Sequence, residues 1–398
     1  ALDLCADDLT HNPGRTAARS QRIEELVAKS PHVVGHRQLW QLEHLAVGAH
    51  HSGQLPAWKL ILETLMTEGL LDAVFATSTV AAGVNFPART IVFFNSDRFN
   101  GREFLPLDPT EFHQMTGRAG RRGMDHIGFA MAVPGKFMDI RRIGKLVTSR
   151  SADVSSQIKI NFSMVLNLLL SHTPDQIEDL LSDSFATFMM VKKKRKKGDR
   201  KPLQDEHKKL WRDFLHHLDF LKETGYVAKD GVLTADGIWA SQLRVDEPLM
   251  IAEGFRRGIL PESDPALLAA MTTLFVNERE SDDHIEKVFK PKTLMAAFLN
   301  VQKGLRPFAA LMADRGFEVR QLFLRPAAAI YAWAAGQPWE KVLGMAEMEE
   351  GDLAMLILRT ADNLRHIRSL KRVFPEAGLT SATSIDLIMR SPVAMEYE

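Results

Sequence analysis

The apolar pattern of the chain changes near residue 150, and this change limits the fold that it can adopt. Before it, three short apolar runs, at residues 73–76, 90–94 and 128–133, are separated by helical patterns. Short apolar runs of this kind are typical of buried strands. Strands that alternate with helices favour a parallel sheet with helices on its faces. We therefore expect the chain to begin with an α/β domain.

After residue 150 the strand pattern fades and helical patterns dominate. Helices are predicted over 164–170, 174–188 and 210–224, and a hairpin over 226–234, around Asp230-Gly231. From Asp246 onward we expect only helices. Their breaks are predicted at residues 258–261 and at prolines 291, 307, 326 and 338.

Composition excludes some classes of function. Lysine plus arginine number 50, as do aspartate plus glutamate, so overall charge does not indicate a polyanionic partner. The single cysteine, Cys5, permits no disulfide within one chain and is typical of a reducing, cytoplasmic compartment. No apolar run approaches the roughly 20 residues that span a bilayer, so we expect no membrane association.

The strongest functional motif is the segment 114–123, Gln-Met-Thr-Gly-Arg-Ala-Gly-Arg-Arg-Gly. We expect it at the start of a helix, where its glycines let the backbone approach a ligand closely. Arg118 and Arg121, three residues apart, would share one helical face and aim planar forks at one triphosphate. The alternative is a solvated basic turn.

A second motif, residues 75–87, runs from an apolar strand into hydroxyl side chains, a glycine and an asparagine. Thr77, Thr79 and the local backbone are suited to contact a phosphate backbone. The alternative is a strand-to-helix turn with a hydroxyl cap. Further upstream, in His50-His51-Ser52-Gly53, Ser52 is a candidate cap for a helix whose start holds a phosphate. A metal site at the two histidines is the less favoured interpretation, because no second ligand cluster has zinc-like spacing.

With these three motifs in this order, the sequence resembles the superkiller-type branch of superfamily-two DExH helicases. That branch includes exosome-assisting RNA helicases and related archaeal DNA helicases. The resemblance implies a second RecA-like domain over residues 1–148, truncated at its N-terminal end. It implies a winged-helix domain over 149–240, beginning near Asn161, with a short basic loop at 190–202. Residues 241–398 would form an all-α bundle, in which residues 350–365 belong to a helix that ratchets along the strand.

The resemblance also implies residue roles. Gln114, Arg118 and Arg121 would face ATP, with Arg121 as the arginine finger. The other implied positions are Gly83 and Asn85, which couple ATP to the strand; Thr77 and Thr79, at the nucleic-acid backbone; and Arg359 and Asp362, near the bases. His51 and Ser52 complete the expected contacts on the motor domain. The family more often has glutamate where this chain has Asp362.

The chain departs from the family in two motifs. It contains no Gly-x-x-x-x-Gly-Lys-Ser/Thr phosphate loop and no Asp-Glu-x-His box. The nearest string, Asp205-Glu206-His207-Lys208, is interpreted as a solvated helix start. We therefore expect ATP and Mg²⁺ to be bound mainly by a missing N-terminal domain, and this chain alone to be inactive.

Partner and substrate remain partly open. The run 192–201 holds eight basic residues, among them Lys193 and Lys194, and is either a nucleic-acid contact or a solvated loop. The expected partner is single-stranded or partly duplex nucleic acid. RNA is favoured because the stretch 98–101, followed by Phe104, is closer to the RNA branch. The alternatives are a DNA helicase, or a non-catalytic nucleic-acid-binding or regulatory module on a degenerate helicase scaffold.

Overall fold

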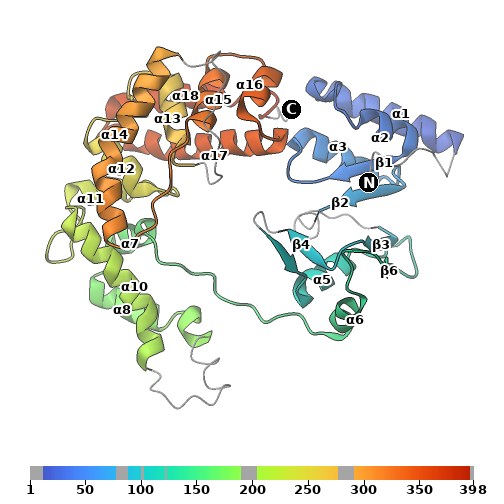
Figure 1. Ribbon diagram of the computed structural model, residues 1–398, viewed down its shortest axis with the longest axis horizontal. Coiled ribbons are helices and arrows are strands. Elements are labelled where there is room, and N and C mark those ends of the chain that lie inside the picture. Colours follow the sequence, from blue (N-terminus) through green and yellow to red (C-terminus); the bar gives the residue numbers. More distant parts are fainter. Residues whose placement is uncertain are drawn as a thin grey trace. The chain divides into compact units, whose positions relative to one another are not determined.

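A computed structural model of the chain describes residues 12–77, 88–99, 103–121, 123–189, 204–276 and 291–394; of residues 204–207 it describes the backbone alone. The chain divides into two compact units. Unit 1 comprises Ala1–Val154, Glu349–Asp352 and Ala394–Glu398, and unit 2 comprises Ser155–Met348 and Leu353–Val393. Helices predominate in both (Figure 1).

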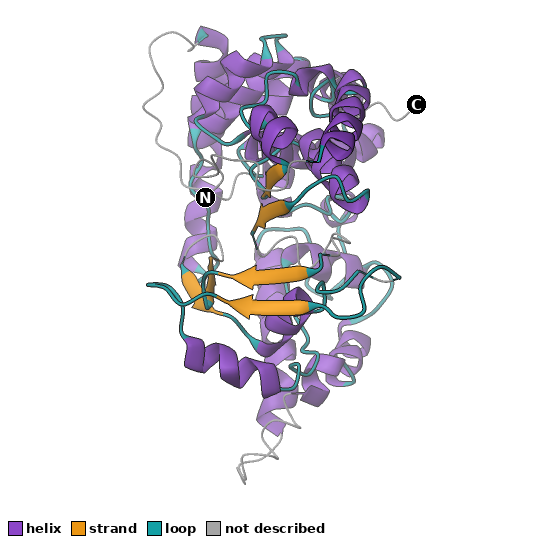
Figure 2. Cartoon of the chain, turned by 90° about the vertical axis from the view of Figure 1, so that its right-hand side faces the viewer, coloured by secondary structure: helices purple, strands orange, loops and turns teal. Residues whose placement is uncertain are grey.

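The strands of unit 1 form three two-stranded sheets within the described residues (Figure 2). β1 (Val47–His50) pairs in parallel with β2 (Ala73–Ala76), and β3 (Thr90–Phe93) pairs in parallel with β6 (Phe129–Ala132). β4 (Asp97–Phe99) and β5 (Phe104–Pro106) pair antiparallel. The three strands predicted from apolar runs are therefore present, and their pairings are parallel as expected.

The expectation that these strands are buried is only partly correct. On the β3–β6 pair, Phe93 is buried in a core with residues of α5 (Pro109–Thr116) and α6 (Ile140–Thr148). Val92 and Met131, which are partners in register and lie on the opposite face, are 41% and 53% exposed. Apolar runs indicate a strand, but the number of helices packed on each face decides its burial.

The N-terminal helices of unit 1 enclose a separate core. α1 (Pro13–Ala28), α2 (Leu39–Leu45) and α3 (Pro56–Thr67) contribute Ile23, Leu42, Trp58 and Leu62 to it. Pro56 occupies the first position of α3, where its missing N–H costs the helix no hydrogen bond. At Gly48 of β1 a Cβ atom would lie 2.4 Å from the Leu62 side chain, so glycine allows the strand to lie directly against α3.

Unit 2 begins with the predicted order of three helices and a hairpin. These are α7 (Phe162–Leu169), α8 (Pro174–Ser182) and α10 (Gln204–Glu223), which begins with the Asp205–Lys208 string. A bridge between Val227 and Leu233 then closes a tight hairpin, with Gly231 at a φ of +91°. α11 (Ala235–Ala240) follows.

The remaining helices form the predicted C-terminal helical region. They are α12 (Pro248–Arg256), α13 (Pro265–Thr273), α14 (Lys292–Asp314), α15 (Leu324–Ala334), α16 (Trp339–Ala346), α17 (Glu350–Ser369) and α18 (Pro375–Ile388), with a 3₁₀ turn at Leu370–Arg372. α13 packs against both α15 and α18. Trp333 and Trp339 are buried, consistent with a core role. None of the helices in the described residues has the length and apolar character needed to cross a bilayer.

The predicted helix break at Pro307 is wrong, because Pro307 lies inside α14. An internal proline costs a helix about 3 kcal/mol. Burial of Val301, Leu305, Phe308 and Met312, on both sides of the proline, offsets that cost, since each buried side chain contributes about 1.5–3 kcal/mol. Propensity alone could not reveal this packing.

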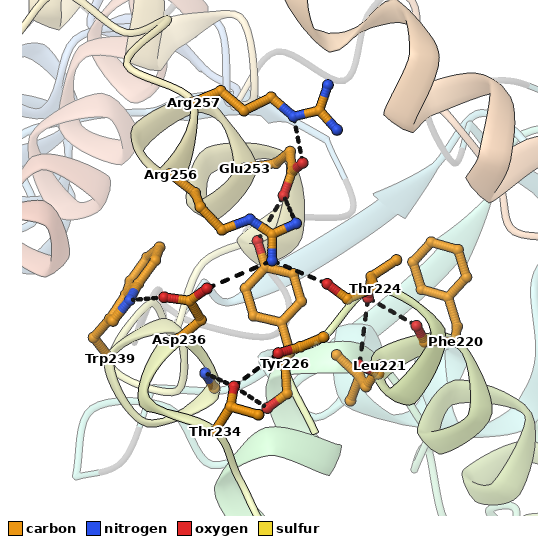
Figure 3. Close-up of polar contacts among 12 residues, drawn as sticks. Phe220, Leu221, Thr224, Tyr226, Thr234, Asp236, Trp239, Glu253, Arg256 and Arg257 are labelled. Carbon is orange, nitrogen blue, oxygen red and sulfur yellow. Dashed lines mark hydrogen bonds and ion pairs between the residues drawn. The ribbon is translucent and has the colours of Figure 1, made fainter. Parts of the chain in front are cut away.

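A buried carboxylate joins α12 to the hairpin of unit 2 (Figure 3). Glu253 is fully buried and accepts a hydrogen bond from the Tyr226 hydroxyl at 3.0 Å. Its two oxygens also pair with Arg256 and Arg257, each at 2.5 Å. Arg256 in addition donates to the Thr224 carbonyl at 3.0 Å. Buried charges persist when they are paired and hydrogen-bonded in this way.

Candidate nucleotide and nucleic-acid interface

The Gly-Arg motif lies at the end of a helix, which corrects the prediction that it begins one. An Asp108 capping box starts α5, which ends at Thr116 with Gly117 as its C-cap. Gly120 and Gly123 have φ values of +89° and +78°. α5 has thus ended before both arginines, and the chain turns at these left-handed glycines. Arg118 and Arg121 therefore lie on an irregular loop, residues 117–121, and not on one helical face.

Main-chain pairing holds this loop against the segment that follows the second motif. The Ala88 N–H donates to the Arg118 carbonyl at 3.1 Å, and the Gly120 N–H donates to the Ala88 carbonyl at 2.8 Å. At Gly128 a Cβ atom would lie 2.5 Å from the Ala119 carbonyl group, so only glycine fits there. The path of the loop is thus set by backbone contacts on two sides.

Within the loop, Arg121 is oriented by Asp125, a partner that the sequence reasoning missed. The guanidinium donates from Nε at 2.8 Å and from a terminal nitrogen at 3.0 Å, and the Arg121 backbone N–H donates at 2.9 Å. These bonds lower the pKa of the Asp125 carboxyl to about 2. A guanidinium has five N–H donors, so three remain beyond the two in this fork. Gln114 lies exposed in the last turn of α5, and Arg118 is half-buried.

A second group of predicted residues lies at the carboxyl edge of the β1–β2 pair. The strands are parallel, so His51 and Thr77, which directly follow them, lie at one edge. The Thr77 N–H donates to the His50 carbonyl at 3.3 Å. Buried Gln54 accepts from the His51 N–H at 3.1 Å and donates to the Ala49 carbonyl at 2.8 Å, which fixes the turn.

The expected capping role of Ser52 is wrong. The N-cap of α3 is Leu55, which makes no side-chain cap bond, and Ser52 is exposed three residues earlier. Pro56 sets the helix start, and burial of Leu55 fixes its approach. His50 is buried and its Nε2 lies 3.1 Å from Glu63. Within the described residues no cluster of three or more histidine, cysteine, aspartate or glutamate side chains is placed to hold a metal ion.

The third predicted group lies on α17 in unit 2. Leu353, Ile357, Leu364 and Ile367 are fully buried and form one apolar stripe along this helix. Off that stripe, Asp362 is exposed and accepts from Arg365 at 3.5 Å.

Arg359 also lies off the stripe, and it pairs with Asp246 at 2.5 Å. Asp246 directly precedes Glu247, the N-cap residue of α12. The sequence could not reveal this partner, because it lies 113 residues away.

Several predicted site residues lie outside the described part of the chain. These are Thr79, Gly83 and Asn85 of the second motif and Lys193 and Lys194 of the basic run. Their roles remain predictions.

Comparison with known proteins finds sequence similarity to one domain family and to several helicases. The family model of the DSHCT (NUC185) domain matches residues 230–396. The probable helicase HelY of Mycobacterium tuberculosis is 41% identical over 142 residues, 36% of this chain and 16% of that protein. Superkiller complex protein 2 of Homo sapiens is 38% identical over 159 residues, 38% of this chain and 13% of that protein. The exosome RNA helicase MTR4 of Homo sapiens is 43% identical over 140 residues, 33% of this chain and 13% of that protein. The chain thus spans between 13% and 16% of the length of these relatives.

Proposed function

We propose that the chain is the C-terminal half of a superkiller-type superfamily-two helicase and acts as part of such a motor. It supplies a second RecA-like lobe, a winged helix and a ratchet-bearing bundle to an ATP-dependent nucleic-acid helicase. RNA is the favoured substrate, since relatives named as RNA helicases are among those it matches. The three-helix and hairpin order of unit 2 supports the winged helix.

The observation that carries this proposal is the fixed loop 117–121. Backbone pairing to Ala88 and the fork to Asp125 hold Arg121 in one orientation on an irregular turn. A charge that is positioned before the reaction stabilises a transferring phosphoryl group without reorganising. In this proposal Arg121 acts as the arginine finger, and Gln114 and Arg118 face the nucleotide from the same loop and helix end.

The remaining parts of the nucleotide site would come from another domain. The sequence has no phosphate loop, and the described residues offer no cluster for a metal ion. We propose that a P-loop domain joined to this chain binds Mg²⁺ and the β- and γ-phosphates. The chain's own residues would add positive charge at the far side of the γ-phosphate, and Gly83 and Asn85 would couple that site to the strand.

The strand itself would be held at two places. His51, Ser52, Thr77 and Thr79 would contact the backbone at the carboxyl edge of β1 and β2. Arg359 and Asp362 would face the bases from α17, with Lys193 and Lys194 adding non-specific affinity. Planar guanidinium groups suit unpaired bases of any sequence because they can stack on them.

The test compares variants of a polypeptide that joins this chain to a P-loop domain. Arg121→Ala should lower strand-stimulated ATP turnover by about 10³-fold or more, while strand affinity stays within about twofold. Arg121→Lys keeps the charge but not the fork, and should recover little of the loss. Arg141→Ala, at an exposed arginine of α6, is the matched control.

Unchanged turnover in Arg121→Ala would contradict the finger assignment. A parallel loss of strand binding and turnover would instead favour the alternative function, a binding module on a helicase scaffold.

A further inference from the structure

Unit 2 contains a pocket that the proposed motor function does not use. The pocket, here called the α12–α14 pocket, lies between α12, α14 and the segment that follows α14, and has a volume of about 460 Å³. Known ligand sites have volumes of roughly 300–1,000 Å³. Its apolar lining comes from Met250, Leu305, Ala309, Val319 and Leu322.

The polar lining of the α12–α14 pocket is cationic. Lys303 and Arg306 are exposed and lie three residues apart on α14, so they share a helical face. Arg320 adds a third positive charge from the following segment, and the described lining includes no carboxylate. The facing acid is Glu247, 3.1 Å from the Arg320 Nε, in a small adjoining recess. The described lining thus carries three cations and no carboxylate, which favours an anionic ligand, although Asp246 and Glu318 also lie near Glu247.

Arg320 also has an unmet hydrogen-bonding group. Its Nη1 is buried and has no hydrogen-bond partner within the described part of the chain. A buried donor left unpaired costs about 1–3 kcal/mol. A carboxylate oxygen that entered the α12–α14 pocket would supply the missing acceptor.

The wall formed by α14 offers an acceptor as well. Gln302 of α14 lines the pocket, and its side-chain amide oxygen can accept a hydrogen bond. A peptide main chain brings N–H donors beside its side-chain carboxylates, whereas in a nucleic-acid strand the anionic phosphodiester linkage itself has acceptors alone. The five apolar side chains of the pocket floor also suit an aliphatic side chain of a peptide, which a nucleic-acid strand does not carry. Both observations favour a peptide over a nucleic-acid strand.

We propose that the α12–α14 pocket binds a short acidic segment of a partner protein. An aliphatic side chain of that segment fills the apolar floor, and carboxylates on either side of it pair with Lys303, Arg306 and Arg320. This inference rests on the geometry of unit 2 and does not depend on the proposed helicase function.

The test uses random 12-residue peptides displayed on phage and selected against the whole 398-residue chain. Enriched peptides should carry at least two carboxylates near a leucine, isoleucine or methionine. A fluorescein-labelled selected peptide is then titrated with the wild type and three variants, by fluorescence anisotropy. Lys303→Glu, which reverses a pocket charge, and Ala309→Trp, which fills the floor, should each raise Kd at least tenfold. Lys292→Glu makes the same charge change on α14 outside the pocket, and should alter Kd less than twofold.

Three results would overturn the proposal. The first is the absence of an acidic consensus among the selected peptides, and the second is an equal Kd for Lys303→Glu and Lys292→Glu. The third is displacement of the peptide by a 12-nucleotide oligouridine, if Lys303→Glu also abolishes the binding of that oligonucleotide. The last would assign the pocket to nucleic acid. Lys303 is exposed, so its replacement keeps the test decisive even where Ala309→Trp fails to fold by circular dichroism.

Discussion

Replacing Glu253 by glutamine tests whether the hairpin and α12 unfold as one block. The carboxylate is fully buried and receives the Tyr226 hydroxyl and two arginines, so the neutral amide would lose both ion pairs. Removing one partner of a buried ion pair costs about 3–5 kcal/mol. Arg256 and Arg257 are 26% and 41% exposed and can recover water, which reduces the expected loss to about 2–3 kcal/mol.

The assay is the thermal melt of the chain followed by circular dichroism. A loss of this size should lower Tm by about 5–10 °C, because each kcal/mol shifts a unit of this length by about 2–4 °C. Glu223→Gln is the matched control, since Glu223 forms a two-bond pair with Arg315 at the surface. Such exposed pairs contribute at most about 1 kcal/mol. If Glu253→Gln lowers Tm no more than Glu223→Gln does, the buried cluster is not a structural joint.

Three further substitutions test the structure. Gly128→Ala should displace the Arg121 loop, because the added methyl group would lie 2.5 Å from the Ala119 carbonyl group. ATP turnover by the polypeptide that joins this chain to a P-loop domain should then fall at least tenfold, and an unchanged rate would contradict the backbone argument. Burial raises the pKa of Glu247 to about 7, so its contribution to stability is complete below about pH 4.5 and lost as pH rises through 7. Glu247→Gln should therefore raise Tm at pH 8 more than at pH 5, and equal changes at the two pH values would be inconsistent with that cause. Arg359→Ala should reduce unwinding far more than basal ATP hydrolysis, with Arg368→Ala, at an exposed arginine in the last turn of α17, as the control.

The sequence predicted elements whose signal is local. The run at residues 73–76 is β2 with the same bounds, and the Asp230-Gly231 turn is the tip of a hairpin. Sequence-based prediction failed where packing between distant residues decides the outcome. At Pro307, for example, α14 continues because apolar residues on both sides of the proline are buried.

The prediction that the arginine motif begins a helix was wrong for a related reason. Alternating glycines and arginines indicate a ligand-binding loop, but they do not indicate whether the loop precedes or follows a helix. The left-handed φ of Gly120 and the pairing of the loop with Ala88 settled that, and neither could be inferred from residue types. Asp125 was available to sequence reasoning, since it lies only four residues from Arg121 and is flanked by a glycine turn.

The two arginines that the proposed motor depends on are each held by an aspartate, but with different strength. Arg121 is bound to Asp125 through two side-chain bonds and a backbone bond, and the Asp125 side chain is only 7% exposed. Its orientation is therefore a property of the loop itself. Arg359 and Asp246 are 35% and 40% exposed, so solvent screens their pair and its contribution is at most about 1 kcal/mol.

A strand that offers a base or a phosphate can replace Asp246 at little cost, whereas a nucleotide would meet Arg121 already oriented. This difference fits the two roles in the proposed function. A finger must keep one geometry throughout a cycle, and a residue that follows a moving strand must change partners at each step.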